Sequence, residues 1–353
     1  MLLNNHQDFA KLDPQNMLAE IDGLPDQLAT AWRLGQTQDL PNLSNIRQII
    51  IAGMGGSAIG ADLLASYASP ICSVPIIVHR DYDLPAFASG PETLFIACSH
   101  SGNTEETLTA FEAALNANCT LIALSTGGKL AKKAASADIP LWEFEHRGQP
   151  RAAVGFSFGM LLALFVRAGF IPSDQVDVAE TVAELKSQQE ALRADVPVHK
   201  NPAKRYAGQS VGRWVTVFGS NYLAPVARRW TGQINEIAKA GSNFSLLPEA
   251  DHNTLAGNHH PEDVMLHTHN LFLRAASDHR RNRLRSNITR KAFMLEGLST
   301  DAYDAKGKTP LSQIWTALHF GDYLAYYLAM SYGVDPTPVD ALISLKERLK
   351  GVE

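Results

Sequence analysis

Two segments of the chain share one order of features: a short apolar run, a turn that contains glycine, and a helical stretch. In the first segment, residues 49–52 are followed by Gly53-Met54-Gly55-Gly56-Ser57. In the second, residues 214–218 are followed by Gly219-Ser220-Asn221. Short apolar runs of this kind are typical of buried parallel strands. The repeat predicts an α/β protein with two doubly wound domains, each a mainly parallel sheet flanked by helices.

Other apolar runs extend the two predicted sheets. In the first half, strands are expected at residues 75–79, 93–98 and 120–124, and a helix at residues 104–115. In the second half, the separation of Gly219 and Val264 nearly equals the separation of Gly53 and Ser99. The next strand of the second sheet is therefore expected at the apolar run around Val264.

The length of 353 residues leaves room for two domains of ordinary size. We expect an N-terminal helical segment at residues 1–45, a first domain at 46–170, a connecting helix at 171–205, and a second domain with a C-terminal helix at 206–353. Residues 154–168 are strongly apolar but shorter than the roughly 20 residues of a membrane span. They are predicted to form a buried helix.

Composition limits the classes of partner. The net charge of -5 provides no general basic face, so neither nucleic acid nor a membrane is expected as a partner, and an anion site must be a local device. The three cysteines lack metal-ligand or disulfide spacing. The N-terminus lacks the basic start and long apolar stretch of a signal peptide, which favours a cytoplasmic location.

The segment Ser99-His100-Ser101-Gly102-Asn103-Thr104 joins a predicted strand to a predicted helix. Free N–H groups at a helix start and neighbouring hydroxyls can bind a phosphate. The same spacing also fits an ordinary helix cap, and the glycine loop before Ser57 also fits a dinucleotide site. Both loops follow strands, so they should face one ligand at the carboxyl edge of the sheet.

Six blocks in order carry a family resemblance: IAGMGGSAIG, CSHSGNTEETL, QPRAAVGFSFG, QINEIAK, EADHN and DPTPVDALISLKERL. The first domain resembles a sugar isomerase (SIS) domain, and the whole chain resembles the bifunctional phosphoglucose/phosphomannose isomerases. The resemblance implies interconversion of glucose 6-phosphate and mannose 6-phosphate with fructose 6-phosphate through a cis-enediol(ate). It implies no cofactor and no metal, and a homodimer. The phosphate ligands that it implies are Gly56, Ser57, Ser99, Ser101 and Thr104.

The resemblance also implies the catalytic residues. Glu236 is the base that moves a proton between C1 and C2, and Arg151 stabilises the charge of the enediolate. His252 assists ring opening together with Lys346, and in related isomerases this histidine comes from the partner subunit. Lys350 is the alternative to Lys346, and Thr337 is the candidate residue near C2.

Several alternatives stay open at this point. By pattern alone, Glu236, Arg151 and Lys346 also fit surface charges. A sugar-phosphate sensor without catalysis, or an isomerase of another aldose phosphate, would use the same fold and the same serine loop. His100 departs from the family, which usually has tyrosine there. The histidines at 259, 260, 267 and 269 have no regular metal-ligand spacing.

Overall fold

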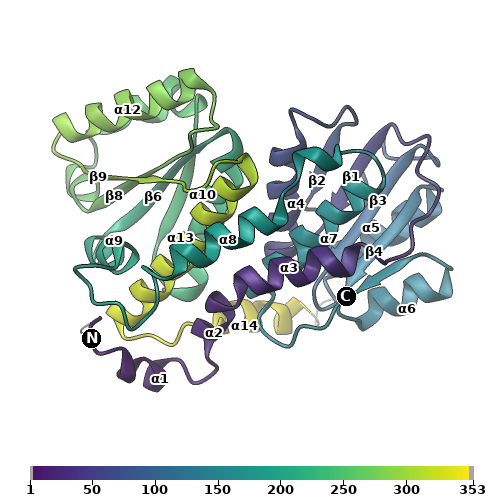
Figure 1. Ribbon diagram of the computed structural model, residues 1–353, viewed down its shortest axis with the longest axis horizontal. Helices are drawn as coiled ribbons and strands as arrows, with labels where there is room; N and C mark the ends of the chain where they lie inside the picture. Colours follow the sequence, from purple (N-terminus) through teal and green to yellow (C-terminus); the bar gives the residue numbers. More distant parts are fainter. Residues whose placement is uncertain (1–2, 350–353) are drawn as a thin grey trace.

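The computed structural model describes residues 3–349, which form two α/β lobes bridged by long helices (Figure 1). The first lobe contains a parallel five-stranded sheet in the order β2-β1-β3-β4-β5. Its strands are β1 (Gln48–Ala52), β2 (Ile76–His79), β3 (Thr93–Ser99), β4 (Thr120–Ser125) and β5 (Leu141–Glu143). The inner strands β1 and β3 are almost entirely buried, as their uninterrupted apolar sequences require.

Helices cover both faces of the first sheet, as parallel strands with helical crossovers demand. They are α4 (Gly55–Ala68), α5 (Glu105–Asn116), α6 (Gly128–Ser136) and α7 (Val154–Arg167). The strongly apolar α7 is buried along most of its length, as predicted for residues 154–168. It packs against α3 (Leu24–Gly35), where Gly159 approaches Ala31 so closely that no side chain would fit.

The second lobe has a parallel four-stranded sheet in the order β7-β6-β8-β9. Its strands are β6 (Trp214–Ser220), β7 (Ser242–Leu247), β8 (Thr268–Arg274) and β9 (Ser299–Asp304), and its helices include α9 (Pro202–Ser210), α10 (Ala224–Ile237), α11 (Glu262–Leu266) and α12 (Arg280–Leu295). The fold class is therefore confirmed: two parallel sheets flanked by helices.

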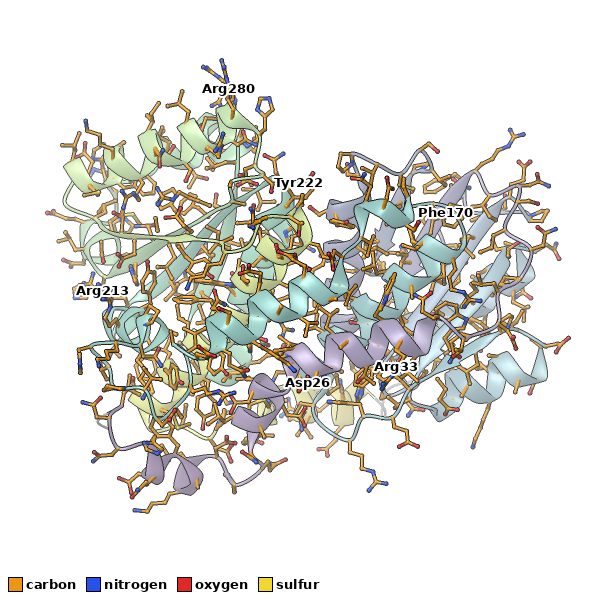
Figure 2. The ribbon with its side chains drawn as sticks, viewed as in Figure 1. Asp26, Arg33, Phe170, Arg213, Tyr222 and Arg280 are labelled. Carbon is orange, nitrogen blue, oxygen red and sulfur yellow. The ribbon has the colours of Figure 1, made fainter. Side chains whose placement is uncertain are left out.

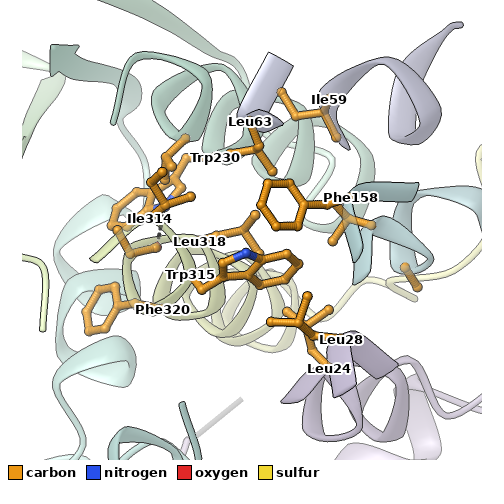
Figure 3. Packing of buried hydrophobic residues seen from close by; sticks show 14 of the residues in the cluster. Leu24, Leu28, Ile59, Leu63, Phe158, Trp230, Ile314, Trp315, Leu318 and Phe320 are labelled. Atoms are coloured by element: carbon orange, nitrogen blue, oxygen red, sulfur yellow. Dashed lines mark hydrogen bonds between the residues drawn. The ribbon is translucent and has the colours of Figure 1, made fainter. Parts of the chain in front are cut away.

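A long helix, α13 (Pro310–Tyr332), lies at the centre of the molecule and is buried over most of its length. The Thr309 hydroxyl accepts the Ser312 N–H, and Gly333 ends the helix with left-handed backbone. Figure 3 shows Trp315 facing Phe158 of α7, with ring centroids 5.2 Å apart. Trp230 of α10 donates from Nε1 to the Ala317 carbonyl at 2.8 Å. α13 thus holds helices of both lobes in one core.

The terminal segments pack onto this core. α1 (Phe9–Leu12) and α2 (Met17–Asp22) precede α3, and Phe9 contacts the ring of Tyr326 on α13 at a centroid distance of 6.0 Å. The last helix, α14 (Asp340–Leu349), has no buried residue. At the junction of the lobes, Ser66 of α4 donates to the carbonyl of Asn221 at 3.0 Å, and Figure 2 shows the next residue, Tyr222, at this junction.

Two predictions of single elements were wrong in detail. Val264 lies in α11, and the strand β8 begins only at Thr268. The strand begins with polar residues, so the sequence lacks the apolar run that usually indicates a buried strand. His269 is nevertheless buried, because its ring forms hydrogen bonds to Ser210 and Asp301. The segment predicted as one connecting helix contains α8 (Val178–Gln189) and the start of α9. Within residues 3–349, no helix has the length and apolarity needed to cross a membrane.

Candidate active site

The serine loop and the glycine loop meet at the carboxyl ends of β1 and β3, which are neighbours in the sheet. The His100 N–H donates to Ser57 Oγ at 3.2 Å, so the two loops are bonded to each other. Ser99 Oγ donates to Thr104 Oγ1 at 2.9 Å. Ser57 and Ser99 are buried, whereas Ser101 is exposed and accepts the Asn103 N–H at 3.2 Å. The structure thus brings together the four predicted hydroxyls beside the N-termini of α4 and α5. We call these four residues and Gly56 the cradle.

A close approach requires glycine at position 56, and a positive φ favours glycine at position 55. A side chain at Gly56 would meet the Pro150 carbonyl oxygen at 2.3 Å, and Gly55 has a φ of +50°. α4 therefore begins directly beside η2 (Pro150–Ala152), the short 3₁₀ helix that carries Arg151. The consequence is that the cradle and Arg151 are adjacent.

The ring of His100 belongs to a chain of hydrogen bonds behind the cradle. His100 Nε2 lies 2.9 Å from His146 Nδ1, and His146 Nε2 lies 3.0 Å from Glu20 Oε2. Burial, together with the charge of His146, lowers the pKa of His100 to about 4. His100 is therefore neutral near pH 7, and its backbone serves the cradle while its ring fixes the loop.

Arg151 is almost fully buried and faces Glu236, with Nη1 at 3.6 Å from Oε2. Its Nη2 donates to the carbonyls of Pro336 and Thr337, the first at 3.0 Å. Burial lowers the pKa of this guanidinium, and Glu236 opposes that effect. Arg151 Nε has no hydrogen-bond partner within residues 3–349. A buried guanidinium with an unused donor, next to a carboxylate, is suited to bind a developing oxyanion.

Glu236 occupies the last turn of α10 and is partly exposed, at 34% of its side chain. A cavity of about 150 Å³ lies between this face of α10 and the start of α4. Its lining is Gly55, Gly56, Ile59, Arg80, Arg151, Arg228, Arg229, Gly232, Gln233 and Glu236. Glu236 also borders a groove of about 630 Å³ between α10 and α14. The base candidate therefore faces open space that begins at the cradle.

Buried polar contacts fix the orientation of α10. Asp322 of α13 accepts from Arg229 at 2.8 Å and from Gln233 at 3.0 Å. At the end of the helix, Lys239 has a φ of +56° and donates to the Glu236 carbonyl at 2.5 Å. Burial and the nearby charge of Arg151 lower the pKa of Lys239. These contacts hold the backbone that carries Glu236 against both the core and the loop at 335–337.

Comparison with known proteins identifies the family. A curated bifunctional phosphoglucose/phosphomannose isomerase from Caldicellulosiruptor bescii is 35% identical over 341 residues, which covers 96% of this chain and 100% of the relative. This chain belongs to the bifunctional phosphoglucose/phosphomannose isomerase family. A second such enzyme, from Aquifex aeolicus, is 31% identical and covers 88% of this chain and 92% of its own length. The model of the bacterial phospho-glucose isomerase C-terminal SIS domain matches residues 199–349.

Solved structures support the fold of this isomerase family member. A hypothetical protein from Thermus thermophilus superposes with a TM-score of 0.74 at 15% identity, covering 99% of this chain and 94% of that protein. The C-terminal domain of glucosamine-fructose-6-phosphate aminotransferase from Francisella tularensis superposes with a TM-score of 0.70 at 14% identity, covering 91% and 98%. At such identities the likeness shows the SIS fold alone.

Three further predicted residues of this isomerase are not part of the cavity lining. His252 ends the 3₁₀ helix η5 (Glu249–His252) and is exposed, and Lys346 is exposed on α14. Neither lines the cavity that contains Glu236. Thr337 is buried, and its hydroxyl has no hydrogen-bond partner in the described part of the chain. Lys350, the alternative lysine, lies outside the described residues.

Sequence reasoning missed several residues that line the cavity of this family member: Arg80, Arg228, Arg229, Gly232 and Gln233. A signal for the α10 residues was present, because 228, 232 and 236 follow the four-residue spacing of one helix face. Arg80 directly follows β2, at the same edge of the sheet as the cradle. Its position at the carboxyl end of a predicted parallel strand could have indicated a role in the site. Among residues 3–349, no group of three or more His, Cys, Asp or Glu side chains is placed to bind a metal.

Proposed function

We propose that this chain interconverts glucose 6-phosphate and mannose 6-phosphate with fructose 6-phosphate. The observation that carries the proposal is the cavity lined by Gly56, Arg151 and Glu236, which places a carboxylate and a guanidinium beside the cradle. The 6-phosphate binds to the hydroxyls of the cradle and to the N-termini of α4 and α5. The sugar then extends past Gly56 toward Glu236.

Glu236 is the base of the proton transfer. Its carboxylate takes the proton from C2 of the open-chain aldose, and the carbonyl oxygen at C1 gains negative charge as the enediolate forms. The protonated Glu236 then gives a proton to C1, and the O2 hydroxyl proton moves to O1 as the C2 carbonyl forms, so the ketose is made with no net proton consumed. While it is held on the carboxyl group, the proton taken from C2 can exchange with solvent. Arg151, at 3.6 Å from Glu236, donates to the charged oxygen through the Nε–H or an Nη–H.

His252 and Lys346 are proposed to serve ring opening. His252 is exposed at the end of η5, so it can reach a site on another subunit, and we propose that it completes the cavity of the partner in a homodimer. Lys346 lies on α14, whose exposed apolar residues include Leu342, Ile343 and Leu345. An exposed apolar face of this kind supports a position at a subunit contact.

Thr337 is proposed to border C2 of the sugar. Its carbonyl accepts a hydrogen bond from Arg151, and this contact supports a position beside the candidate enediolate site. A small residue there leaves room for the planar C2 carbon to accept the proton on either face. Acceptance of both glucose and mannose 6-phosphates requires that room.

A coupled assay tests the proposal by following fructose 6-phosphate formed from each aldose phosphate. We expect turnover of both sugars by the wild type and a loss of at least about 100-fold in kcat for Glu236→Gln, the usual weight of a general base. Glu262→Gln, an exposed carboxylate on α11, is the matched control and should retain activity. Full activity in Glu236→Gln would remove Glu236 as the base, and tight binding without turnover in the wild type would indicate a sensor.

A further inference from the structure

Two arginines that the proposed mechanism does not use line the same cavity. Arg80 follows β2 in the first lobe, and Arg228 lies on α10 in the second lobe. Both contact one carboxylate oxygen, Asp62 Oδ2 on α4, and the Arg228 Nη1 distance is 3.5 Å. The three side chains form a cluster, which we call the arginine pair and its carboxylate.

The arginine pair carries more charge than its carboxylate neutralises. Within residues 3–349, Asp62 is the single ion-pair partner of both guanidinium groups, so two positive charges share one negative charge. Arg80 also donates to the Ala58 carbonyl at 3.2 Å, which is a neutral acceptor. The pair therefore leaves one positive charge uncompensated at the cavity wall.

Both guanidinium groups are fixed in place rather than free in solvent. Arg80 is held by Asp62 and by the Ala58 carbonyl, and its side chain is 27% exposed. Arg228 lies over the ring of Phe244 at 5.1 Å from the centroid, and its side chain is 43% exposed. Held guanidinium groups lose little side-chain entropy when they bind a phosphate, which is the ligand that their fork geometry fits.

Space for a ligand lies beside the pair. Along α10, Gly232 is one turn from both Arg228 and Glu236, and a side chain at Gly232 would meet open space. Arg228 and Glu236 are eight residues apart, about 12 Å along the helix axis, so their side chains leave α10 about two turns apart and line one cavity. The start of α4 at Gly55 lines the same wall and adds the positive end of a helix dipole.

We infer that Arg80 and Arg228 form a second phosphate subsite in the cavity, distinct from the cradle. Its ligand is a phosphoryl dianion, either free phosphate or the second phosphate of a bisphosphorylated sugar whose first phosphate occupies the cradle. The inference rests on the proposed function for the position of that first phosphate. It predicts that this isomerase binds phosphate while a sugar monophosphate fills the cradle.

Calorimetry with two unreactive ligands tests the subsite without turnover. In one arm, inorganic phosphate is titrated into protein saturated with glucitol 6-phosphate. In the other arm, the Kd of glucitol 1,6-bisphosphate is compared with the Kd of glucitol 6-phosphate. We expect phosphate binding in the first arm, or at least about tenfold tighter binding of the bisphosphate in the second, at low ionic strength. The arm that responds distinguishes free phosphate from sugar-borne phosphate.

Variants of Arg228 test whether the arginine pair is responsible for phosphate binding. Arg228→Gln should abolish the response, Arg228→Lys should retain part of it because the charge remains, and Arg47→Gln removes an exposed arginine as the charge-matched control. Retention of the Lys variant also guards against loss of folding in the Gln variant. No response in either arm, or an equal response in wild type and Arg228→Gln, overturns the subsite. If glucitol 6-phosphate itself fails to bind, the proposed function fails as well, so the two failures are distinguishable.

Discussion

Each lobe contains a corresponding pair of neighbouring parallel strands, β1 and β3 in the first and β6 and β8 in the second. Different chemical groups lie at the carboxyl ends of the two pairs. In the first lobe, β1 and β3 end in the cradle, where hydroxyls bond to one another and to two backbone N–H groups. In the second lobe, β6 and β8 end at Ser220 and at the loop before α12. There Ser220 Oγ donates to Asp278 Oδ2 at 3.2 Å, and the Ala275 N–H donates to the same oxygen at 3.2 Å. The second lobe thus holds an internal carboxylate where the first can hold a phosphate.

The turn that follows β6 is also held by hydrogen bonds within the protein. Asn221 follows β6 with a φ of +45°, and its Oδ1 accepts from the His279 N–H at 3.2 Å and from Asn282 Nδ2 at 2.7 Å. The helix α12 is therefore capped by the protein itself. Within residues 3–349, the Ser57 hydroxyl of the first repeat accepts a hydrogen bond and keeps its own proton for a ligand, whereas the Ser220 hydroxyl of the second repeat donates to Asp278. This difference is the one that the proposed roles require, with phosphate binding in the first lobe and Glu236 in the second.

The largest expected effect comes from giving the first lobe the carboxylate of the second. Ser101→Asp places a negative charge in the cradle, and juxtaposed like charges cost several kcal/mol. We expect KM for both aldose phosphates to rise by at least about 100-fold, with the fold intact because Ser101 is exposed. Steady-state kinetics measures this. Ser101→Asn is the neutral control of equal size, and an equal rise in KM for the control would show that size rather than charge is responsible.

A smaller effect is expected from removing one hydroxyl from each lobe. Ser57→Ala removes a donor to the phosphate, and a hydrogen bond to a charged group contributes about 1.5–3 kcal/mol, so KM should rise by about 10- to 100-fold. Ser220→Ala should leave KM unchanged and should lower the free energy of unfolding by about 1–3 kcal/mol, because Asp278 loses a donor. Kinetics and denaturant titration on both variants separate the roles. A rise in KM for Ser220→Ala would contradict the comparison.

The pH dependence of stability should reveal Asp278. Burial raises its pKa to about 6 from the ordinary 3.8. The folded protein then binds more protons than the unfolded chain, so this group costs stability as pH rises from about 4 through 6. Asp278→Asn should therefore increase the free energy of unfolding by about 1–3 kcal/mol at pH 8 and by little at pH 4. Denaturant midpoints across this range measure the difference, and equal gains at both pH values would remove Asp278 as its source.

His100 should change the pH dependence of stability in the opposite direction. Its pKa is lowered to about 4 from 6.5, mainly by burial and then by His146, while the nearby Glu20 carboxylate partly opposes this. The unfolded chain then binds more protons, so stability is complete above about pH 6.5 and declines as pH falls toward 4. His100→Tyr, which restores the residue usual in the family, should flatten this acid side of the profile. An unchanged profile would mean that His100 is not the source of the loss of stability in acid.

The sequence predicted what depends on local pattern. The runs at 49–52 and 93–98 are continuous and apolar, so β1 and β3 were identified within a residue or two, and the cradle followed from their position. β8 was misplaced because its first three residues are polar and become buried only through partners such as Ser210 and Asp301. α13 was not predicted, although it organises the core, because its role depends on packing between distant helices.

The residues of the candidate site could likewise be proposed from the sequence only in part, and their contacts could not. Arg151 and Glu236 were proposed through blocks of the family, but their separation of 3.6 Å arises because α10 and η2 both pack against α4. The pairing of Arg80 with Arg228 through Asp62 joins three elements from two lobes. No spacing along the chain encodes such a contact. Tertiary structure was therefore necessary for every site feature that crosses between the lobes.

Hydrogen exchange at C2 tests most directly whether the first lobe binds the phosphate and the second lobe supplies the base for proton transfer. Glucose 6-phosphate is incubated in D2O with wild type or with Glu236→Gln, and NMR follows the C2 hydrogen while calorimetry gives the Kd of glucitol 6-phosphate. We expect exchange in the wild type, a loss of at least about 100-fold in the variant, and a Kd within about twofold. Exchange at the wild-type rate in Glu236→Gln, or loss of binding together with exchange, would contradict the assignment of phosphate binding to the first lobe and proton transfer to the second.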